Sequence, residues 1–395
     1  MTNSLMSSGF ERDLASRLFN AGWYLSENPD VARSGLDPLT HYLERGAWEW
    51  RNPHPLFDSQ WYLGQYPEVA TAGRNPLLHY LTDGVSALND PHPLFDTRTY
   101  LRMCGRIPTG MTPLELFLAS ERPALAGAYR SIEALQEMQQ AFLDRVTVEI
   151  FSDHRKRPAR WAVFLQCGRP SLHEQWLTAT PKPWHLIANF YDDTYQRPLP
   201  ADMVLVQNQG TKFTGVYRLL KDRPEFFQPY DYILFLDDDI LVTEDQVTRL
   251  FEVVQALSLK LAQPAVKPES AYTWPVLLEQ RGSIGRYLNT VEIMMPVISR
   301  DALSVGAYLF GRSISGWGLD FALGQTVSRA FGRGQAGVID AVSFLHSKAI
   351  DTDEGHYYGM LRSHGLSALV EERAIRLCYG AQGPIELEQD ETADE

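Results

Sequence analysis

The sequence has few cysteines and no long apolar run. Its three cysteines, Cys104, Cys167 and Cys378, lie too far apart for a disulfide framework or a zinc knuckle and are typical of a reducing compartment. No stretch reaches the roughly 18 apolar residues that span a bilayer, and the first residues show no basic segment followed by an apolar one. We therefore expect a cytoplasmic protein without signal peptide or membrane span, in peripheral contact at most with the inner face of the membrane.

An excess of positive charge is also missing. The chain has 36 Lys and Arg against 49 Asp and Glu, which gives a net charge of -13 at pH 7. Because nucleic-acid affinity requires a basic stripe, this composition excludes nucleic acid as an expected partner. Part of the negative charge lies in the last ten residues, and we predict an acidic disordered tail over 381–395. With 395 residues and 44% hydrophobic residues, the chain can form two folded domains.

The first part of the chain repeats itself at a period of 38 residues. WYLSENPDVARSGLDPLTHYLERG (23–46) aligns with WYLGQYPEVATAGRNPLLHYLTDG (61–84), and a third, more divergent copy begins at Phe95. Asp58 and Asp96 are placed as helix N-caps, and the prolines of DPL and NPL suit the first turn of a further helix. This pattern predicts an all-α repeat module over 1–122, followed by a helical connector over 123–157.

Four histidines recur with the repeat: His41 with His79 and His54 with His92. They could be metal ligands, but no carboxylate or thiol recurs at ligand spacing, so we interpret them as repeated core and cap residues. The module resembles the short helical repeats attached to many bacterial glycosyltransferases of surface-polysaccharide clusters. That resemblance implies contacts with a glycan, a protein partner or a second copy of the chain.

From Trp161 the periodicity changes. Short apolar runs alternate with helical stretches, which is typical of a mostly parallel, Rossmann-like α/β sheet, here predicted over 158–380. The runs are WAVFLQC (161–167), WHLIANF (184–190), MVLVQN (203–208) and YILFLD (232–237). Ligands of such sheets bind beyond the carboxyl ends of the strands. The candidate binding residues are therefore those that follow the runs: Gly168, Arg169, Tyr191, Asp192, Lys212, Asp237, Asp238 and Asp239.

Three consecutive carboxylates end the last of these runs, in FLDDDI (235–240). Buried charges need partners, so the triplet requires a cation, basic groups or solvent. Asp237 and Asp239 project to the same side of an extended chain, and such a pair suits Mn²⁺ or Mg²⁺ that bridges a diphosphate. The alternative is a solvated loop with an aspartate that caps the helix predicted over 243–250.

Two later motifs carry further polar residues. In SGWGLDFALGQ (315–325), a glycine turn places the aromatic face of Trp317 at the surface, where it is a candidate for acceptor binding. Asp320 is placed as a general base or as a helix N-cap. In LHSK (345–348), His346 follows an apolar run and could be a third metal ligand, and Lys348 could face a phosphate. Taken alone, Asp320 and His346 fit an ordinary structural role better, and only the motifs together favour the functional one.

Two more residues are candidates for acceptor binding. Glu292 lies in the apolar segment TVEIMMPVISR (290–300), which we expect to be a short strand. Because glutamate is seldom buried unpaired, it either binds an acceptor hydroxyl or pairs with Arg312. Trp274, in SAYTWP, could stack on a sugar ring or belong to the core.

A strand that ends in DxD, a later G-W-G-x-D and a later histidine resemble the ordered signature of GT-A glycosyltransferases. The wider stretch 158–350 resembles DUF707, a family of uncharacterised GT-A-like proteins, through FLDDDI, NTVEIMMPVISR (289–300), GWGLD and the VID…H run. The resemblance implies a GT-A-like fold and metal-dependent transfer from a nucleotide-sugar donor, with Asp237, Asp239 and His346 as metal ligands. It also implies that Asp320 is the general base of an inverting reaction.

The same resemblance assigns donor contacts to residues that follow the strands. They are Gly168, Arg169, Tyr191, Asp192, Lys212, Asp237 and Asp238. The acceptor would be a growing, possibly lipid-linked surface polysaccharide. The chain departs from the family pattern in GWGLD, where many inverting enzymes have two adjacent acids. It also lacks the later Q/R-x-x-R-W motif of processive synthases, which excludes a membrane polymerase.

Two other classes of function fit the same residues. The first is a non-catalytic protein with a degenerate transferase fold that binds glycan or scaffolds a synthesis complex. The second is a nucleotidyltransferase or phosphohydrolase of nucleotide sugars. A nucleotidyltransferase needs a glycine-rich loop after its first strand, and LQCGRPS has one glycine there, so this class fits less well.

Overall fold

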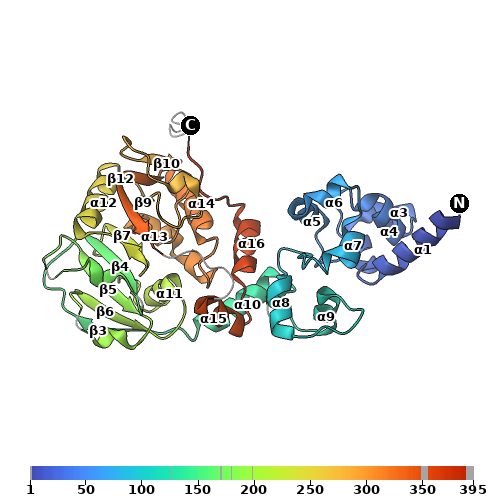
Figure 1. Ribbon diagram of the computed structural model, residues 1–395, viewed down its shortest axis with the longest axis horizontal. Coiled ribbons are helices and arrows are strands. Elements are labelled where there is room, and N and C mark those ends of the chain that lie inside the picture. Colours follow the sequence, from blue (N-terminus) through green and yellow to red (C-terminus); the bar gives the residue numbers. More distant parts are fainter. Residues whose placement is uncertain are drawn as a thin grey trace. The chain divides into compact units, whose positions relative to one another are not determined.

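The computed structural model describes residues 2–125, 127–169, 171–178, 180–197, 199–347 and 355–387. It divides into two compact units, of which one comprises Met1–Met138 and Gly359–Ala374 and the other Gln139–Tyr358 and Ile375–Glu395 (Figure 1). Across the described ranges, no helix has the length and apolarity needed to cross a membrane.

The first unit consists mainly of short helices, and two successive sets of them have the same order. The first set is α2 (Ala21–Glu27), α3 (Pro29–Ser34), α4 (Pro38–His41) and the π-turn η1 (Tyr42–Gly46). The second set is α5 (Ser59–Gln65), α6 (Pro67–Thr71), α7 (Pro76–His79) and the π-turn η2 (Tyr80–Gly84). The unit also contains α1 (Thr2–Ser16), α8 (Thr97–Cys104), α9 (Pro113–Ala119) and a two-stranded hairpin of β1 (Ala124–Leu125) and β2 (Ala128–Tyr129).

The repeated residues hold these helices in the same way in each set. Asp58 accepts the N–H of the third residue of α5, and Asp96 does the same for α8, which confirms both predicted N-caps. The Tyr24 hydroxyl lies 2.9 Å from Nδ1 of His41, and one repeat later the hydroxyl of Tyr62 lies 2.9 Å from Nδ1 of His79. The recurring histidines of this pair therefore bond to core tyrosines of their own repeat.

The second unit is built on a ten-stranded sheet with the order β10-β12-β9-β11-β7-β4-β5-β6-β3, and β8 pairs with β12. Strands β4, β5, β6, β7, β9 and β12 run in one direction, so the predicted mostly parallel α/β fold is confirmed. The four predicted apolar runs contain β4 to β7. The strands are β3 (Val148–Asp153), β4 (Trp161–Cys167), β5 (His185–Phe190), β6 (Met203–Gln207), β7 (Tyr232–Leu236), β8 (Ile240–Leu241), β9 (Leu261–Val266), β10 (Arg286–Leu288), β11 (Val297–Ser299) and β12 (Ala336–His346).

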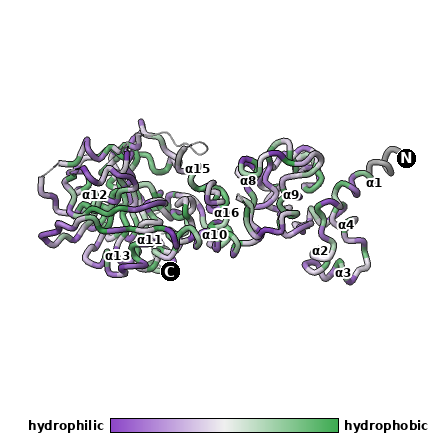
Figure 2. The backbone as a smooth tube through the Cα atoms, turned by 90° about the horizontal axis from the view of Figure 1, so that it is seen from below, coloured by the Kyte–Doolittle hydropathy of each residue, from purple (hydrophilic) through white to green (hydrophobic). Residues whose placement is uncertain are grey.

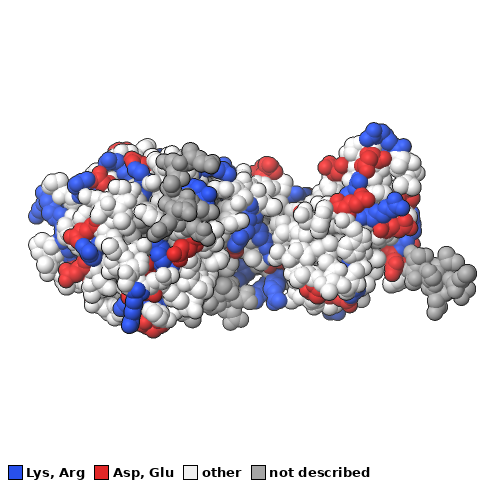
Figure 3. Space-filling model, turned by 90° about the horizontal axis from the view of Figure 1, so that it is seen from above, with Lys and Arg blue, Asp and Glu red and all other residues white. Residues whose placement is uncertain are grey.

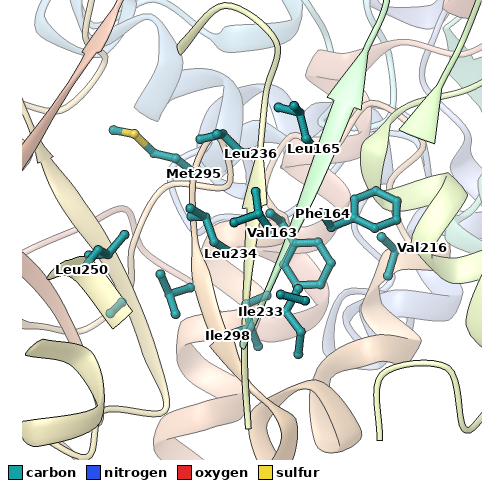
Figure 4. Packing of buried hydrophobic residues seen from close by; sticks show 14 of the residues in the cluster. Val163, Phe164, Leu165, Val216, Ile233, Leu234, Leu236, Leu250, Met295 and Ile298 are labelled. Carbon is teal, nitrogen blue, oxygen red and sulfur yellow. The ribbon is translucent and has the colours of Figure 1, made fainter. Parts of the chain in front are cut away.

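Helices cover both faces of the sheet. Phe213 of α11 (Lys212–Asp222) packs on Phe235, whose cross-strand neighbour in β4 is Phe164. Phe251 of α12 (Glu244–Ala256) stacks on Trp161, which is also in β4 but points to the opposite face of the sheet. Figure 4 shows Val216 of α11 and Leu250 of α12 on opposite sides of the strands, and Figure 2 shows the hydrophobic segments gathered in the strands of this unit.

The remaining helices complete the chain order. The helices are α10 (Ile132–Leu143), α11 (Lys212–Asp222), α12 (Glu244–Ala256), α13 (Arg300–Gly306), α14 (Leu319–Phe331), α15 (His356–Ser363) and α16 (Ala368–Tyr379). Shorter 3₁₀ turns are η3 (His173–Gln175), η4 (Asp193–Gln196), η5 (Pro275–Leu277) and η6 (Ala307–Gly311).

Three expectations about local structure differ from the structure. The range 123–157 contains helix α10 but also strand β3, because β3 pairs with β6 at the edge of the sheet. Residues 381–387 of the predicted disordered tail are ordered, since Ile385 accepts the N–H of Asn289 at 3.1 Å and Leu387 donates to Tyr287 at 3.0 Å. Residues 388–395 lie outside the described part of the chain.

The third difference concerns the segment around Glu292. A strand was predicted over 290–300, but β11 covers Val297–Ser299 only, and residues 293–295 form a turn. The carbonyl groups of Ile293 and Met294 accept hydrogen bonds from the ammonium of Lys212, at 2.9 and 2.8 Å. The hydrogen-bond partner of these carbonyls is therefore a buried side chain instead of the backbone of a neighbouring strand.

Candidate functional site

Three aspartates follow β7 in a turn at the carboxyl end of the sheet, and each contacts a different part of the fold. Asp237 Oδ1 lies 2.8 Å from Nζ of Lys212. Asp238 Oδ2 accepts the hydroxyl of Tyr191 at 2.5 Å. Asp239 Oδ2 lies 3.5 Å from Nε2 of His346. The turn Asp237–Asp239, called the acidic turn below, is therefore the point where loops from several strands meet.

The orientation of His346 is fixed from behind. Its Nδ1 lies 2.9 Å from the carbonyl oxygen of Ala271, and because a carbonyl can only accept, Nδ1 carries a proton and Nε2 faces Asp239. Burial lowers the pKa of His346, but the hydrogen bonds with Asp239 and Ala271 and the charge of Glu292 outweigh burial and raise it. Metal-binding histidines have this arrangement, with the second ring nitrogen bonded to a carbonyl or carboxylate.

Two protein side chains, rather than three, are brought together for a cation. In the described ranges, no three His, Cys, Asp or Glu side chains form a group that could hold a metal ion. Asp239 and His346 are adjacent, and Asp237 is bound to Lys212. Mg²⁺ is often held by one or two carboxylates and completed by substrate phosphates and water, and Asp239 supplies one such carboxylate with the imidazole of His346 beside it.

Lys212 is enclosed by protein groups. Its side chain is 5% exposed, and its ammonium donates to the carbonyl oxygens of Ile293, Met294 and Phe235, at 2.9, 2.8 and 3.3 Å, besides pairing with Asp237. Burial lowers the pKa of Lys212, and Asp237 opposes that shift. Burial likewise raises the pKa of Asp237, and Lys212 opposes it. Lys212, which we expected to contact a donor, thus positions the first aspartate of the acidic turn.

A cavity of about 410 Å³ lies beyond the carboxyl ends of β4 and β5. A side chain at Gly168 would not fit, because its Cβ would lie 1.9 Å from the ring of Tyr191. The carboxylate of Asp192 links two segments that line the cavity. One of its oxygens accepts the N–H of Arg169 at 2.8 Å, and the other accepts the N–H of Thr194 at 2.9 Å. The cavity is lined by Gly168, Arg169, Ser171, His173, Glu174, Phe190, Thr194, Arg197 and Leu199.

The cavity wall is bonded to the acidic turn through Ser171, which lines the cavity and whose hydroxyl donates to the carbonyl of Asp238 at 3.4 Å. Tyr191 bridges from the end of β5 to the carboxylate of Asp238, and burial together with this negative charge raises the pKa of Tyr191. The backbone N–H of Leu172 donates to the carbonyl of Asp238 at 2.7 Å. Glu174 and Arg197, which also line the cavity, were not predicted, because they lie well beyond the strand ends, where no sequence motif marks them.

Glu292 is influenced electrostatically by Asp237 of the acidic turn. Its backbone N–H donates to Oε1 of Gln263 at 2.7 Å. Burial raises the pKa of its carboxyl group, and the Thr273 hydroxyl and the positive groups His346 and Lys212 oppose that shift. The groups acting on Glu292 are thus those of the candidate site, rather than Arg312.

Asp320 lies in the first turn of α14 and is 7% exposed. Gly318, with φ 79°, is the N-cap of that helix, so the alternative role of Asp320 as N-cap is wrong. Its Oδ1 accepts the N–H of Phe321 at 3.0 Å, and the hydroxyl of Thr290 donates to its carbonyl group. The segment that carries Glu292 is therefore bonded to the start of α14.

The two candidate tryptophans lie against other aromatic rings. Trp317 is half-buried and edge-on to Tyr358, with ring centroids 6.2 Å apart. Trp274 is edge-on to Phe321 at 5.9 Å, and a Cβ at Gly383 would lie 2.5 Å from its ring. Both rings are partly buried, so each packs on one neighbour and keeps part of its surface open. Lys348 lies outside the described residues.

No protein-family model and no curated protein matches this chain, so the resemblance to DUF707 stays a prediction. Among solved structures, the chain is similar to S. aureus TarS 1–349 in complex with UDP-GlcNAc, at 9% identity and a TM-score of 0.34, over 52% of this chain and 65% of that one. It is also similar to the mannosyltransferase PcManGT from Pyrobaculum calidifontis in complex with GDP-Man and Mn²⁺, at 13% identity and a TM-score of 0.34, over 59% and 70%. The match thus spans less than two thirds of the TarS chain.

Proposed function

We propose that this chain transfers a sugar from a nucleotide-sugar donor to a glycan acceptor, with Mn²⁺ or Mg²⁺ as cofactor. The observation that carries the proposal is the acidic turn: Asp239 lies beside His346, and Asp238 is hydrogen-bonded to Tyr191 and to Ser171 of the cavity wall beyond β4 and β5. A paired carboxylate and histidine beside a nucleotide-sized cavity is an arrangement suited to a diphosphate with its cation.

The donor nucleotide would occupy the cavity beside Gly168. Arg169 and Arg197 on its wall supply positive charge and N–H donors, and Glu174 supplies an acceptor for a base or ribose group. The ring of Tyr191 lies against Gly168, and its hydroxyl holds the carboxylate of Asp238 toward the cavity. Donor binding and the acidic turn are in this way coupled through one hydrogen bond.

Asp239 and His346 would hold the cation, with Asp237 beside them. When bound, the cation supplies charge neutralisation for the departing diphosphate. The carbonyl of Ala271 orients the imidazole of His346, and Lys212 holds the carboxylate of Asp237 in place. Because protein hydrogen bonds already hold the imidazole of His346 and the carboxylate of Asp237, little reorganisation is needed when the donor binds.

The acceptor would lie toward Asp320 and Glu292. In our proposal Asp320 takes the proton of the acceptor hydroxyl while the oxygen of that hydroxyl attacks the anomeric carbon of the donor sugar. The bond between the anomeric carbon and the diphosphate breaks, and the configuration at that carbon inverts. Glu292 and Trp317 offer a hydrogen-bond acceptor and an aromatic face to the acceptor sugar, and Trp274 offers a second aromatic face. We expect Asp320→Asn to lose transfer while keeping diphosphate binding. The acceptor class we infer is a surface polysaccharide handled at the inner face of the membrane.

The test is a calorimetric titration of UDP, GDP and CDP, with and without Mn²⁺. Wild type should bind one of them in a Mn²⁺-dependent manner, and Asp239→Asn should lose that dependence. Asp231→Asn is the matched control, since Asp231 precedes the same strand and pairs with Arg160 at the opposite end. Absence of any nucleotide binding would overturn the proposal and favour a non-catalytic glycan-binding or scaffolding protein.

A second readout separates transfer from other reactions of nucleotide sugars. With the donor identified, incubation with an acceptor should yield the nucleoside diphosphate and a glycosylated acceptor in equal amounts. Release of pyrophosphate would indicate a nucleotidyltransferase, and release of free sugar or sugar phosphate a phosphohydrolase.

A further inference from the structure

The helical unit contains a groove of about 770 Å³, far larger than the cavity beside Gly168. One wall is α1, around Phe10, and the other is formed by the first and second repeats, through Trp48 and Arg74. Phe10 is 65% exposed and Trp48 is 41% exposed. Two exposed aromatic rings thus border an open groove, whereas most tyrosines of this unit are buried.

A comparison of the two repeats shows that the fold does not require Trp48. At a period of 38 residues, Trp48 corresponds to Ser86 and Trp50 to Leu88. Trp50 and Leu88 both have a φ of 60°, so the backbone at this point is the same in each repeat. The second repeat adopts the same conformation with a serine in place of Trp48. The exposed ring at position 48 therefore has no counterpart in the packing of the repeat.

The charges around the groove favour an uncharged ligand. Arg12 is paired with Asp37 at 2.8 Å and Arg74 with Asp83 at 2.5 Å, so both guanidinium charges are neutralised while further N–H donors remain. Within the described residues, the groove carboxylates Glu11 and Glu44 have no ion-pair partner. The lining is thus weakly acidic, and it repels polyanions. Figure 3 shows acidic and basic side chains interspersed on the visible face of this unit, with no single basic patch.

We propose that this groove binds a neutral oligosaccharide. Sugar rings have apolar faces that stack on aromatic side chains, and their hydroxyl groups pair with carboxylates and guanidinium N–H donors. Trp48 and Phe10 supply the aromatic faces, and Glu11, Glu44 and Arg74 supply the polar groups. The volume accommodates a short oligosaccharide rather than a single sugar. That this ligand is part of the acceptor of the transfer reaction rests on the function proposed above; the binding itself does not.

The test uses the full chain and defined probes. Cellohexaose, maltohexaose, mannohexaose and chitohexaose are titrated calorimetrically, with an oligogalacturonate as the anionic comparison. At least one neutral probe should bind, and Trp48→Ser, which installs the residue of the second repeat, should weaken it about tenfold or more. Trp50→Leu is the matched control: it also installs the residue of the second repeat, at an exposed position outside the groove lining, and should change affinity less than twofold.

Three outcomes would overturn the proposal. They are binding of none of the neutral probes, preference for the anionic probe, and equal affinity of wild type and Trp48→Ser. A further outcome would also overturn it: self-association of wild type in sedimentation that Trp48→Ser abolishes, because the groove would then be an interface between copies.

Failure of this proposal can be told from failure of the proposed function. Asp239→Asn should keep the affinity for the neutral probe while losing Mn²⁺-dependent nucleotide binding. Trp48→Ser should show the reverse. If nucleotide binding is absent and the neutral probe still binds through Trp48, the groove stands as a glycan site without the transferase.

Discussion

His346 and Asp239 are brought to 3.5 Å from one another by the pairing of two strands. Strand β8 begins one residue after Asp239 and pairs antiparallel with the end of β12, with Ile240 opposite His346. Ser347, next to His346, donates its backbone N–H to the carbonyl of Asp239 at 3.2 Å and its hydroxyl to the same oxygen at 3.0 Å. The relative positions of carboxylate and imidazole are therefore set by main-chain pairing.

We predict that His346→Gln weakens Mn²⁺-dependent nucleotide binding by about tenfold or more, because it removes the ring nitrogen that faces Asp239. Metal-free binding of the nucleotide should change little. Titration of Mn²⁺ by paramagnetic resonance at fixed nucleotide concentration measures the difference. The control is His185→Gln, at the start of β5, where the ring bonds Tyr230 and the carbonyl of Arg157 instead. Unchanged Mn²⁺ affinity in His346→Gln would contradict this role.

We predict that Lys212→Met destabilises the fold by about 2 kcal/mol. The substitution leaves Asp237 without its partner beside two further carboxylates, and it frees three carbonyl groups. Because Asp237 is partly exposed, we expect a smaller loss of stability than for an ion pair in which both partners are fully buried.

Urea unfolding of Lys212→Met and of Lys221→Met gives the comparison. Lys221 lies on the same helix, and its ion pair with Asp144, at 3.7 Å, is exposed, so its removal should change stability by less than about 0.5 kcal/mol. Equal stabilities of the two variants would show that the buried pair contributes nothing to folding.

We predict that Gly168→Ala reduces nucleotide binding without unfolding the chain. The added Cβ would meet the ring of Tyr191 and move its hydroxyl away from Asp238. Tyr191→Phe should reproduce part of the loss, since it removes the hydrogen bond but keeps the ring. Gly64→Ala is the control, because nothing lies within 4 Å of a Cβ there. Calorimetric affinities equal to wild type in Gly168→Ala would contradict the coupling of cavity and acidic turn.

We predict that two histidines of the repeats make stability depend on pH. Burial lowers the pKa of His54 and of His92 from 6.5 to about 4. In each, Nδ1 accepts a backbone N–H, from Leu56 at 3.0 Å and from Leu94 at 3.1 Å. Between pH 6.5 and pH 4 the unfolded state binds more protons than the folded state. The contribution of the two histidines to the free energy of unfolding is therefore complete above about pH 6.5 and is lost as the pH falls toward 4. The loss is at most roughly 1.4 kcal/mol per residue for each unit of pKa difference.

The measurement is the urea midpoint of wild type and of the double variant His54→Asn and His92→Asn, from about pH 7.5 to about pH 4.5. Asparagine retains an acceptor oxygen for the same N–H but does not titrate in this range. The double variant should therefore lose stability less steeply on acidification. Parallel pH profiles would show that these histidines are not the titrating groups.

The sequence by itself determined the elements whose signal is local. The 38-residue period, the N-caps Asp58 and Asp96 and the apolar runs of β4 to β7 depend on hydrophobic spacing and on side chains that bond their own backbone, and each was predictable. The acidic turn was predictable for the same reason, because three carboxylates after an apolar run are unusual in any context.

Only the tertiary structure decided which partners these residues have. Lys212 and Asp237 are far apart in the chain, and the crossover that follows β6 places the ammonium beneath the turn, where it also binds the carbonyls of Ile293 and Met294 and keeps that segment from forming the predicted strand. The pairing of β8 with β12 brings His346 to Asp239. Contacts of this kind depend on sheet order and register, which are set by the packing of the whole domain and leave no local pattern in the sequence.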